Sequence, residues 1–126
     1  MRFIEERVAE IERLCAPIAQ DVLVLRLTTE TLKLVVRLRD GASLRVAERW
    51  QAETLLRYSY YWLDAQDALV VGWDNSPHHT QLDNFPHHKH IREQATRAPS
   101  YEVGLEDVLG VLGDAMDDKP PIGSSK

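Results

Sequence analysis

The chain has few of the features that mark secreted and membrane proteins. Its single cysteine, Cys15, has no partner within the chain, so an internal disulfide is excluded. No run of about eighteen apolar residues occurs, and a transmembrane helix is therefore not expected. Glu5 and Glu6 make the first residues too acidic for a secretion signal. These absences favour a cytoplasmic protein.

The charges are unevenly spread along the chain. The net charge is −5, yet residues 22–62 carry seven Lys and Arg against four acids, and residues 101–126 carry six acids against two lysines. The overall acidity argues against a protein that coats nucleic acid non-specifically. A basic face over residues 22–62 could still receive a phosphodiester, although cations also occur on the solvated side of ordinary strands.

The hydrophobic pattern predicts an α+β fold. Ile4, Val8, Ile11 and Cys15 repeat with a helical period, which predicts a helix over residues 2–16 with Cys15 on its buried face. Residues 32–39 alternate strictly between apolar and polar, as in a strand with one buried face. Further strands are expected in the segments 22–27, from 44 onward, 55–63 and 68–73.

Short connections between these segments indicate an antiparallel meander of about five strands. Asp40-Gly41 predicts a tight hairpin in which both central residues have positive φ. A helix with Leu105, Val108 and Leu112 on its apolar face should pack on the sheet together with the N-terminal helix. We expect one domain over residues 1–116, a flexible tail over 117–126, and arginines and aromatic residues on the uncovered sheet face.

All five histidines lie between His78 and His90, in a segment with few aliphatic residues that we expect to be mainly a loop. Each pair, His78-His79 and His87-His88, follows a proline that stiffens the backbone. A short extended piece is expected around residues 85–91. There His88 and His90 would project to one side, with His87 and Lys89 on the other.

These histidines suggest RNA cleavage without a cofactor, because two imidazoles can act as the acid and the base near neutral pH. Lys89 and Arg57 could stabilise charge on the phosphate, and aromatic rings could stack on bases. The candidate catalytic residues are His78, His79, His87, His88, Lys89 and His90. The candidate substrate-binding residues are Arg57, Tyr58, Tyr60, Trp73 and Asp74.

Three alternatives stay open. His88 and His90, joined by His78 or His79 and with or without Asp74, could bind a metal ion for a hydrolase as a three-histidine or a histidine–carboxylate set, although no established zinc spacing is present. The histidine segment could instead bind a protein or nucleic acid without catalysis, or serve only to hold its own loop. Tyr58 and Tyr60 also fit simple packing on the sheet.

Four strings in the sequence are distinctive. They are Tyr58-Ser59-Tyr60-Tyr61-Trp62, Trp73-Asp74-Asn75-Ser76-Pro77-His78-His79, Asn84-Phe85-Pro86-His87-His88-Lys89-His90 and Pro99-Ser100. Together they resemble the TumE family of prokaryotic toxin–antitoxin modules. The resemblance covers about residues 20–116. It implies a cytoplasmic toxin that an antitoxin with a helix-turn-helix DNA-binding domain holds inactive. RNA and a second copy of the chain are further candidate partners. The resemblance assigns no catalytic residue.

Overall fold

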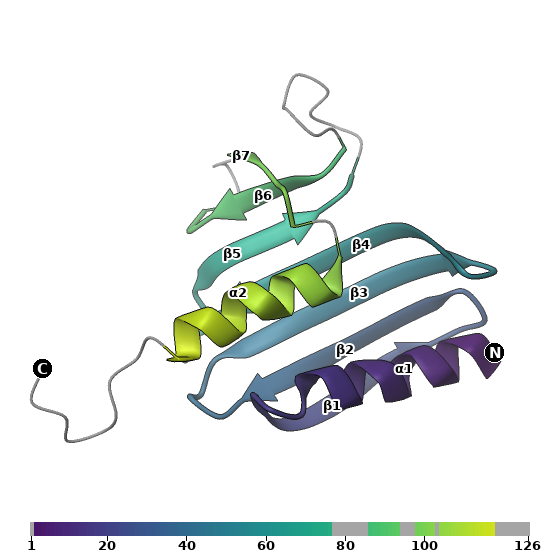
Figure 1. The fold of residues 1–126 in the computed structure, drawn as a ribbon, viewed down its shortest axis with the longest axis horizontal. Coiled ribbons are helices and arrows are strands. Elements are labelled where there is room, and N and C mark those ends of the chain that lie inside the picture. Colours follow the sequence, from purple (N-terminus) through teal and green to yellow (C-terminus); the bar gives the residue numbers. More distant parts are fainter. Residues whose placement is uncertain (1, 77–85, 94–97, 103, 118–126) are drawn as a thin grey trace, which may run out of the picture.

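The computed structural model describes residues 2–76, 86–93, 98–102 and 104–117. These form two helices and one seven-stranded sheet (Figure 1). The elements, in chain order, are α1 (Arg2–Cys15), β1 (Ala19–Leu27), β2 (Thr31–Leu38), β3 (Ser43–Gln51), β4 (Thr54–Leu63), β5 (Leu69–Asp74), β6 (His88–Ile91), β7 (Ala98–Pro99) and α2 (Leu105–Asp117). Among the described residues, no helix has the length and apolar character needed to span a lipid bilayer.

The sheet confirms the predicted antiparallel meander and extends it. Its strands lie in the order β1 to β7, and each pairs antiparallel with the next. The two strands beyond the expected five, β6 and β7, belong to the segment predicted to be mainly loop. Part of that segment, His88–Ile91, is the extended piece that was expected. β7 contains Pro99, which has no N–H to donate to a neighbouring strand. An edge strand tolerates proline, because one of its sides pairs with no strand.

Both helices lie on one face of the sheet, as predicted (Figure 1). The alternation of β2 places Leu32, Leu34, Val36 and Leu38 on that face, where each is at most 1% exposed. The periodic apolar positions of the helices meet these strand residues in one core cluster. The helix members of the cluster are Ile4, Val8, Ile11, Cys15, Leu105, Val108 and Leu112. Burial of these side chains, about 2 kcal/mol for each large one, holds the two layers together.

A charged group inside this core ties α1 to β3. Glu48 is 3% exposed and accepts hydrogen bonds from Arg7 Nε at 2.8 Å and Nη2 at 2.7 Å. It also accepts from Tyr60 Oη at 2.5 Å and from Trp50 Nε1 at 2.9 Å. Burial disfavours the Arg7 charge, but Glu48 outweighs that cost and holds the Arg7 pKa above its ordinary value. The carboxylate is therefore fully paired.

The Asp40-Gly41 hairpin forms with one residue more than the shortest turn. Gly41 has a φ of 91°, and its N–H donates to the Leu38 carbonyl, while the Leu38 N–H donates to Ala42. Of the two central residues, only Gly41 takes a positive φ. This geometry is that of a three-residue hairpin loop, in which a single left-handed residue is enough.

Several expectations concern residues outside the described ranges. These are the histidine pair His78-His79 and the tail, of which only Asp117 is described, as the last residue of α2. The limits of the domain therefore stay a prediction.

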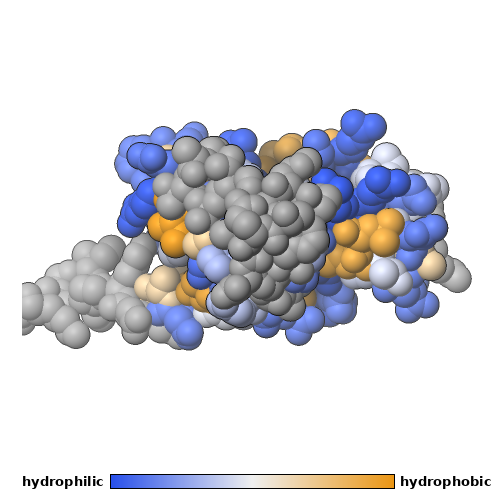
Figure 2. All heavy atoms as spheres, turned by 90° about the horizontal axis from the view of Figure 1, so that it is seen from above, coloured by the Kyte–Doolittle hydropathy of each residue, from blue (hydrophilic) through white to orange (hydrophobic). Residues whose placement is uncertain are grey.

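Seen from above, the described surface is mostly hydrophilic with separate hydrophobic patches (Figure 2).

Candidate functional site: a carboxylate between two histidines

The pairing of β5 with β6 creates the candidate site. Asp74 lies opposite His88 in the register, and Gly72 lies opposite His90. Because residues two apart on a strand share a face, these four positions lie on the same side of the sheet. That side is the one the helices leave uncovered, since Trp73, between Gly72 and Asp74, is part of the core. The expectation that His88 and His90 project together is confirmed.

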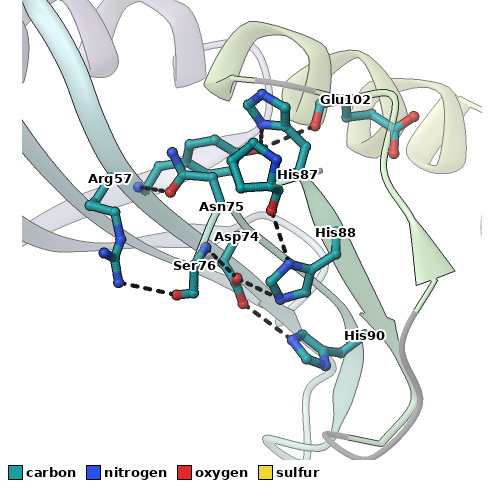
Figure 3. A network of polar contacts seen from close by, with 10 residues as sticks. Arg57, Asp74, Asn75, Ser76, His87, His88, His90 and Glu102 are labelled. Atoms are coloured by element: carbon teal, nitrogen blue, oxygen red, sulfur yellow. Dashed lines mark hydrogen bonds and ion pairs between the residues drawn. The ribbon is translucent and has the colours of Figure 1, made fainter. Parts of the chain in front are cut away.

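The Asp74 carboxylate binds both imidazoles (Figure 3). Its Oδ1 is 2.7 Å from His88 Nε2, and its Oδ2 is 3.2 Å from His90 Nε2. The two rings meet edge to face, with centroids 5.0 Å apart and planes at 82°. His88 and His90 are only 3% and 5% exposed. One carboxylate thus holds a nearly buried pair of histidines.

Main-chain groups hold this arrangement from outside. His88 Nδ1 lies 3.1 Å from the Pro86 carbonyl oxygen, and the Ser76 N–H donates to Asp74 Oδ1 at 3.0 Å. Such outer contacts orient a functional imidazole and determine which of its nitrogens carries the proton. Each ring nitrogen of His88 therefore faces an oxygen.

Gly72 allows an aromatic ring to pack beside the histidines. A Cβ atom at Gly72 would lie 3.1 Å from the Tyr61 ring, closer than most real contacts. The Tyr61 ring lies 6.4 Å from the ring of His90, centroid to centroid. A side chain larger than hydrogen at position 72 would push Tyr61 away from the site.

The neighbouring end of β5 is anchored to β4. The Asn75 side chain accepts a hydrogen bond from the Tyr58 N–H at 2.8 Å and donates to the Leu56 carbonyl at 3.1 Å. Arg57 Nη2 donates to Ser76 Oγ at 3.4 Å (Figure 3). The exposed guanidinium of Arg57 therefore contacts Ser76, which is two residues after Asp74 in the chain.

His87 and Lys89 lie on the opposite side, toward α2, as the alternation predicts. His87 Nδ1 is 2.8 Å from Tyr58 Oη, and Lys89 Nζ is 3.5 Å from Glu102 Oε1. Burial lowers the pKa of His87, and the charge of His88 lowers it further. The Trp73 indole also donates to Glu102, at 2.8 Å. These contacts connect β5, β6 and the segment before α2.

Three of the aromatic candidates are packing residues in this structure. Tyr58, Tyr60 and Trp73 are 4%, 0% and 1% exposed and belong to the core cluster. Burial raises the pKa of Tyr58, as do the charges of Asp74, Glu102 and Asp107. None of the three presents an open ring face for a base. Tyr58 stacks on His87, whereas Tyr61, which the alternation places on the same face as Arg57 and Ser59, lies near His90.

The uncovered face is basic around this site. Lys33, Arg45, Arg49 and Arg57 alternate with the core residues of β2, β3 and β4, and all four are exposed. Two hollows lie among them. One, of about 250 Å³, is bordered by Lys33, Arg49, Arg57 and Ser76, and the other, of about 300 Å³, by Lys33, Arg45 and Tyr61. The predicted basic face with arginines is confirmed.

The structure therefore brings together three of the candidate residues, Asp74, His88 and His90, and Arg57 contacts Ser76, two residues after Asp74. The sequence prediction missed Glu102, Ser76 and the Pro86 carbonyl. Ser76 and Pro86 belong to the motif strings, but no pattern assigns a role to any of the three, because their contacts are made only when the strands pair. His78 and His79 lie outside the described residues.

Comparison with protein families identifies the chain. The family model for the toxin TumE matches residues 5–116, so the match includes most of α1 as well as the region where the motif strings lie. Comparison with curated proteins and with solved structures gives no significant match. The family match implies a toxin of a toxin–antitoxin module, with an antitoxin as its partner. The chain belongs to the TumE toxin family.

Proposed function

We propose that this toxin is a histidine-dependent endoribonuclease that acts in the cytoplasm. The observation that carries the proposal is the position of the Asp74–His88–His90 cluster on the same uncovered, basic sheet face as Arg45, Arg49 and Arg57. A polyanion that lies on this face would bring a phosphodiester close to the two imidazoles.

Cleavage of RNA through its 2′-hydroxyl requires removal of one proton, delivery of another to the 5′-oxygen, and stabilisation of charge on the phosphate. His88 and His90 could transfer these protons, and Asp74 would hold the two rings in place. Arg57 lies beside Ser76 and can neutralise the phosphate. Since both rings are nearly buried, RNA binding must open the site before a phosphate touches them.

The test compares RNA cleavage by the wild-type chain with that by His88→Gln and His90→Gln. Glutamine can still donate a hydrogen bond to Asp74, but it cannot act as an acid or base near neutral pH. We expect both variants to lose at least about a hundredfold in cleavage rate, within the range for acid–base groups. His87→Gln is the matched control, because His87 lies on the α2 side and should tolerate the change.

RNA binding is tested separately through the basic face. Arg45→Gln and Arg49→Gln should weaken RNA binding and reduce its dependence on salt, because each removes one phosphate contact. Arg13→Gln, an equal change of charge on the exposed side of α1, should leave binding unchanged. Full cleavage by the His88 and His90 variants, or no RNA damage by the folded wild-type chain, would contradict the proposal.

The burial of both histidines favours one competing function, a binding module without turnover. Rings that are 3% and 5% exposed can hold β5 to β6 through Asp74 without touching a ligand, which leaves binding to the basic face. In that case the histidine variants would lose affinity for RNA or for a protein partner, and no cleavage product would appear with the wild-type chain.

For the partner, we propose an antitoxin that carries a helix-turn-helix DNA-binding domain. The family implies an antitoxin, and such a domain would let the pair control its own expression. Co-expression with the protein encoded by the neighbouring reading frame should restore growth and yield a stable complex. Light scattering of the toxin alone and of the complex would show whether a homodimer forms.

A further inference from the structure

We propose that Asp74, His88 and His90 form a binding site for a divalent transition-metal ion, with zinc as the representative ion. Each residue offers one ligand atom, and these atoms lie within 4.8 Å of one another. Two imidazole nitrogens and one carboxylate oxygen are a donor set that such ions accept. The proposal goes beyond the proposed function, because it does not require that RNA be the substrate.

Oxygen atoms face both ring nitrogens of His88. Nδ1 lies 3.1 Å from the Pro86 carbonyl oxygen, and Nε2 lies 2.7 Å from Asp74 Oδ1. Because the carbonyl can only accept a hydrogen bond, it favours the tautomer with the hydrogen on Nδ1, which leaves the lone pair of Nε2 directed at the carboxylate. This is the orientation in which His88 could coordinate a cation through Nε2.

The convergence of three groups favours the metal ion. The carboxylate that faces His88 Nε2 also faces His90 Nε2, at 3.2 Å, so three potential ligands meet at one place. In a tetrahedral site with bonds of about 2.0 Å the ligand atoms lie about 3.3 Å apart, so the contact of 3.2 Å already fits and the contact of 2.7 Å would have to lengthen. Small outward shifts of the side chains would admit the ion.

The surroundings are those of a built metal site. The Pro86 carbonyl and the Ser76 N–H act as outer partners that orient one imidazole and the carboxylate. All three ligands lie on two paired strands, β5 and β6, and the register of this pairing fixes their positions relative to one another. Three protein ligands leave a coordination position for water or substrate, as in catalytic rather than structural sites.

The test measures Zn²⁺ binding by the full chain after removal of metal with a chelator. Calorimetry should show one Zn²⁺ per wild-type chain, and Asp74→Asn, His88→Gln and His90→Gln should each weaken binding at least about a hundredfold. The control His87→Gln should keep wild-type affinity, because His87 lies on the opposite side of the sheet from the three ligands. Circular dichroism reports whether each variant is folded.

A second measurement uses only the wild-type chain, in case a variant does not fold. Added Co²⁺ should give the intense visible absorption of a low-coordinate protein site, and Zn²⁺ should displace it. Absence of saturable Zn²⁺ binding by the folded wild-type chain, an absorption spectrum equal to that of hydrated Co²⁺, or unchanged affinity in folded His88→Gln would overturn the metal site.

RNA cleavage assayed in chelator distinguishes the two proposals. Metal binding without any cleavage would support the ion site and contradict the nuclease. Cleavage by a chain that binds no Zn²⁺ would support the nuclease with direct proton transfer and overturn the ion site.

Discussion

Glu48→Gln tests whether the buried ion pair holds α1 on the sheet. The substitution keeps the size of the side chain and one oxygen acceptor but removes the negative charge beside Arg7. Removal of one partner from a buried pair costs about 3–5 kcal/mol, because the other charge stays buried and unpaired. Arg7 keeps its contact with Glu10 at 2.6 Å, so we expect the lower end, about 3 kcal/mol.

Urea unfolding followed by circular dichroism measures this loss. With a slope of about 1.5 kcal/mol per molar, the midpoint should fall by about 2 M. The double variant Arg7→Met/Glu48→Gln should be more stable, by about 2 kcal/mol, than the sum of the single changes predicts, because it removes both charges together. Methionine retains apolar contact with Trp50, over which the Arg7 guanidinium lies at 5.2 Å.

Asp21→Asn provides the matched control. Asp21 also accepts two short hydrogen bonds from an arginine, Arg37, and these hold its pKa below the usual range. This pair is exposed, and water and salt screen it, so its loss should move the midpoint much less. Comparable losses for the two carboxylates, or single changes at Arg7 and Glu48 that simply add, would refute the reasoning.

Two further predictions concern single residues of the scaffold. Burial raises the pKa of Cys15 to about 11, although the charge of Arg7 lowers it, so the thiol should react with a disulfide reagent at pH 8 only after unfolding. The folded chain retains this proton after the unfolded chain has lost it. The contribution of Cys15 to the free energy of unfolding should therefore be full below about pH 9 and fall by up to about 3 kcal/mol as the pH rises to 11. Rapid labelling of the thiol in the folded chain at pH 8 would contradict the predicted protection of Cys15. Among the glycines, Gly110→Ala should stabilise the chain by about 0.5–1 kcal/mol, because α2 leaves open space for a methyl group there. Gly41→Ala should destabilise it by at least about 1 kcal/mol, because the φ of Gly41 is 91°. Urea midpoints that move in the same direction for the two variants would disprove this contrast.

The candidate site was predictable where it depends on alternation. A strand places residues two apart on one face, so the spacing of His88 and His90 was enough to predict that they project together. The same rule separated His87 and Lys89 from them. It also placed Arg57 and Tyr61 on the basic face and Tyr58 on the other.

The rule does not say which face is covered. Tyr58 and Tyr60 fit both a base-stacking surface and a packing surface until the two helices are placed. Both helices cover the side that carries these rings, which removes them from solvent and leaves Tyr61 near His90 on the other face. The outcome depends on contacts between elements distant in the sequence.

Local chemistry along the chain determined the helices, the first five strands, the hairpin at Gly41 and the concentration of histidines, because periodicity and turn preference act between near neighbours. Only the tertiary structure decided that Asp74 lies between two imidazoles. That contact requires β5 and β6 to pair in one register, across residues that carry little hydrophobic signal. A shift by one residue would turn His88 and His90 to the opposite face, and the carboxylate would lose both partners.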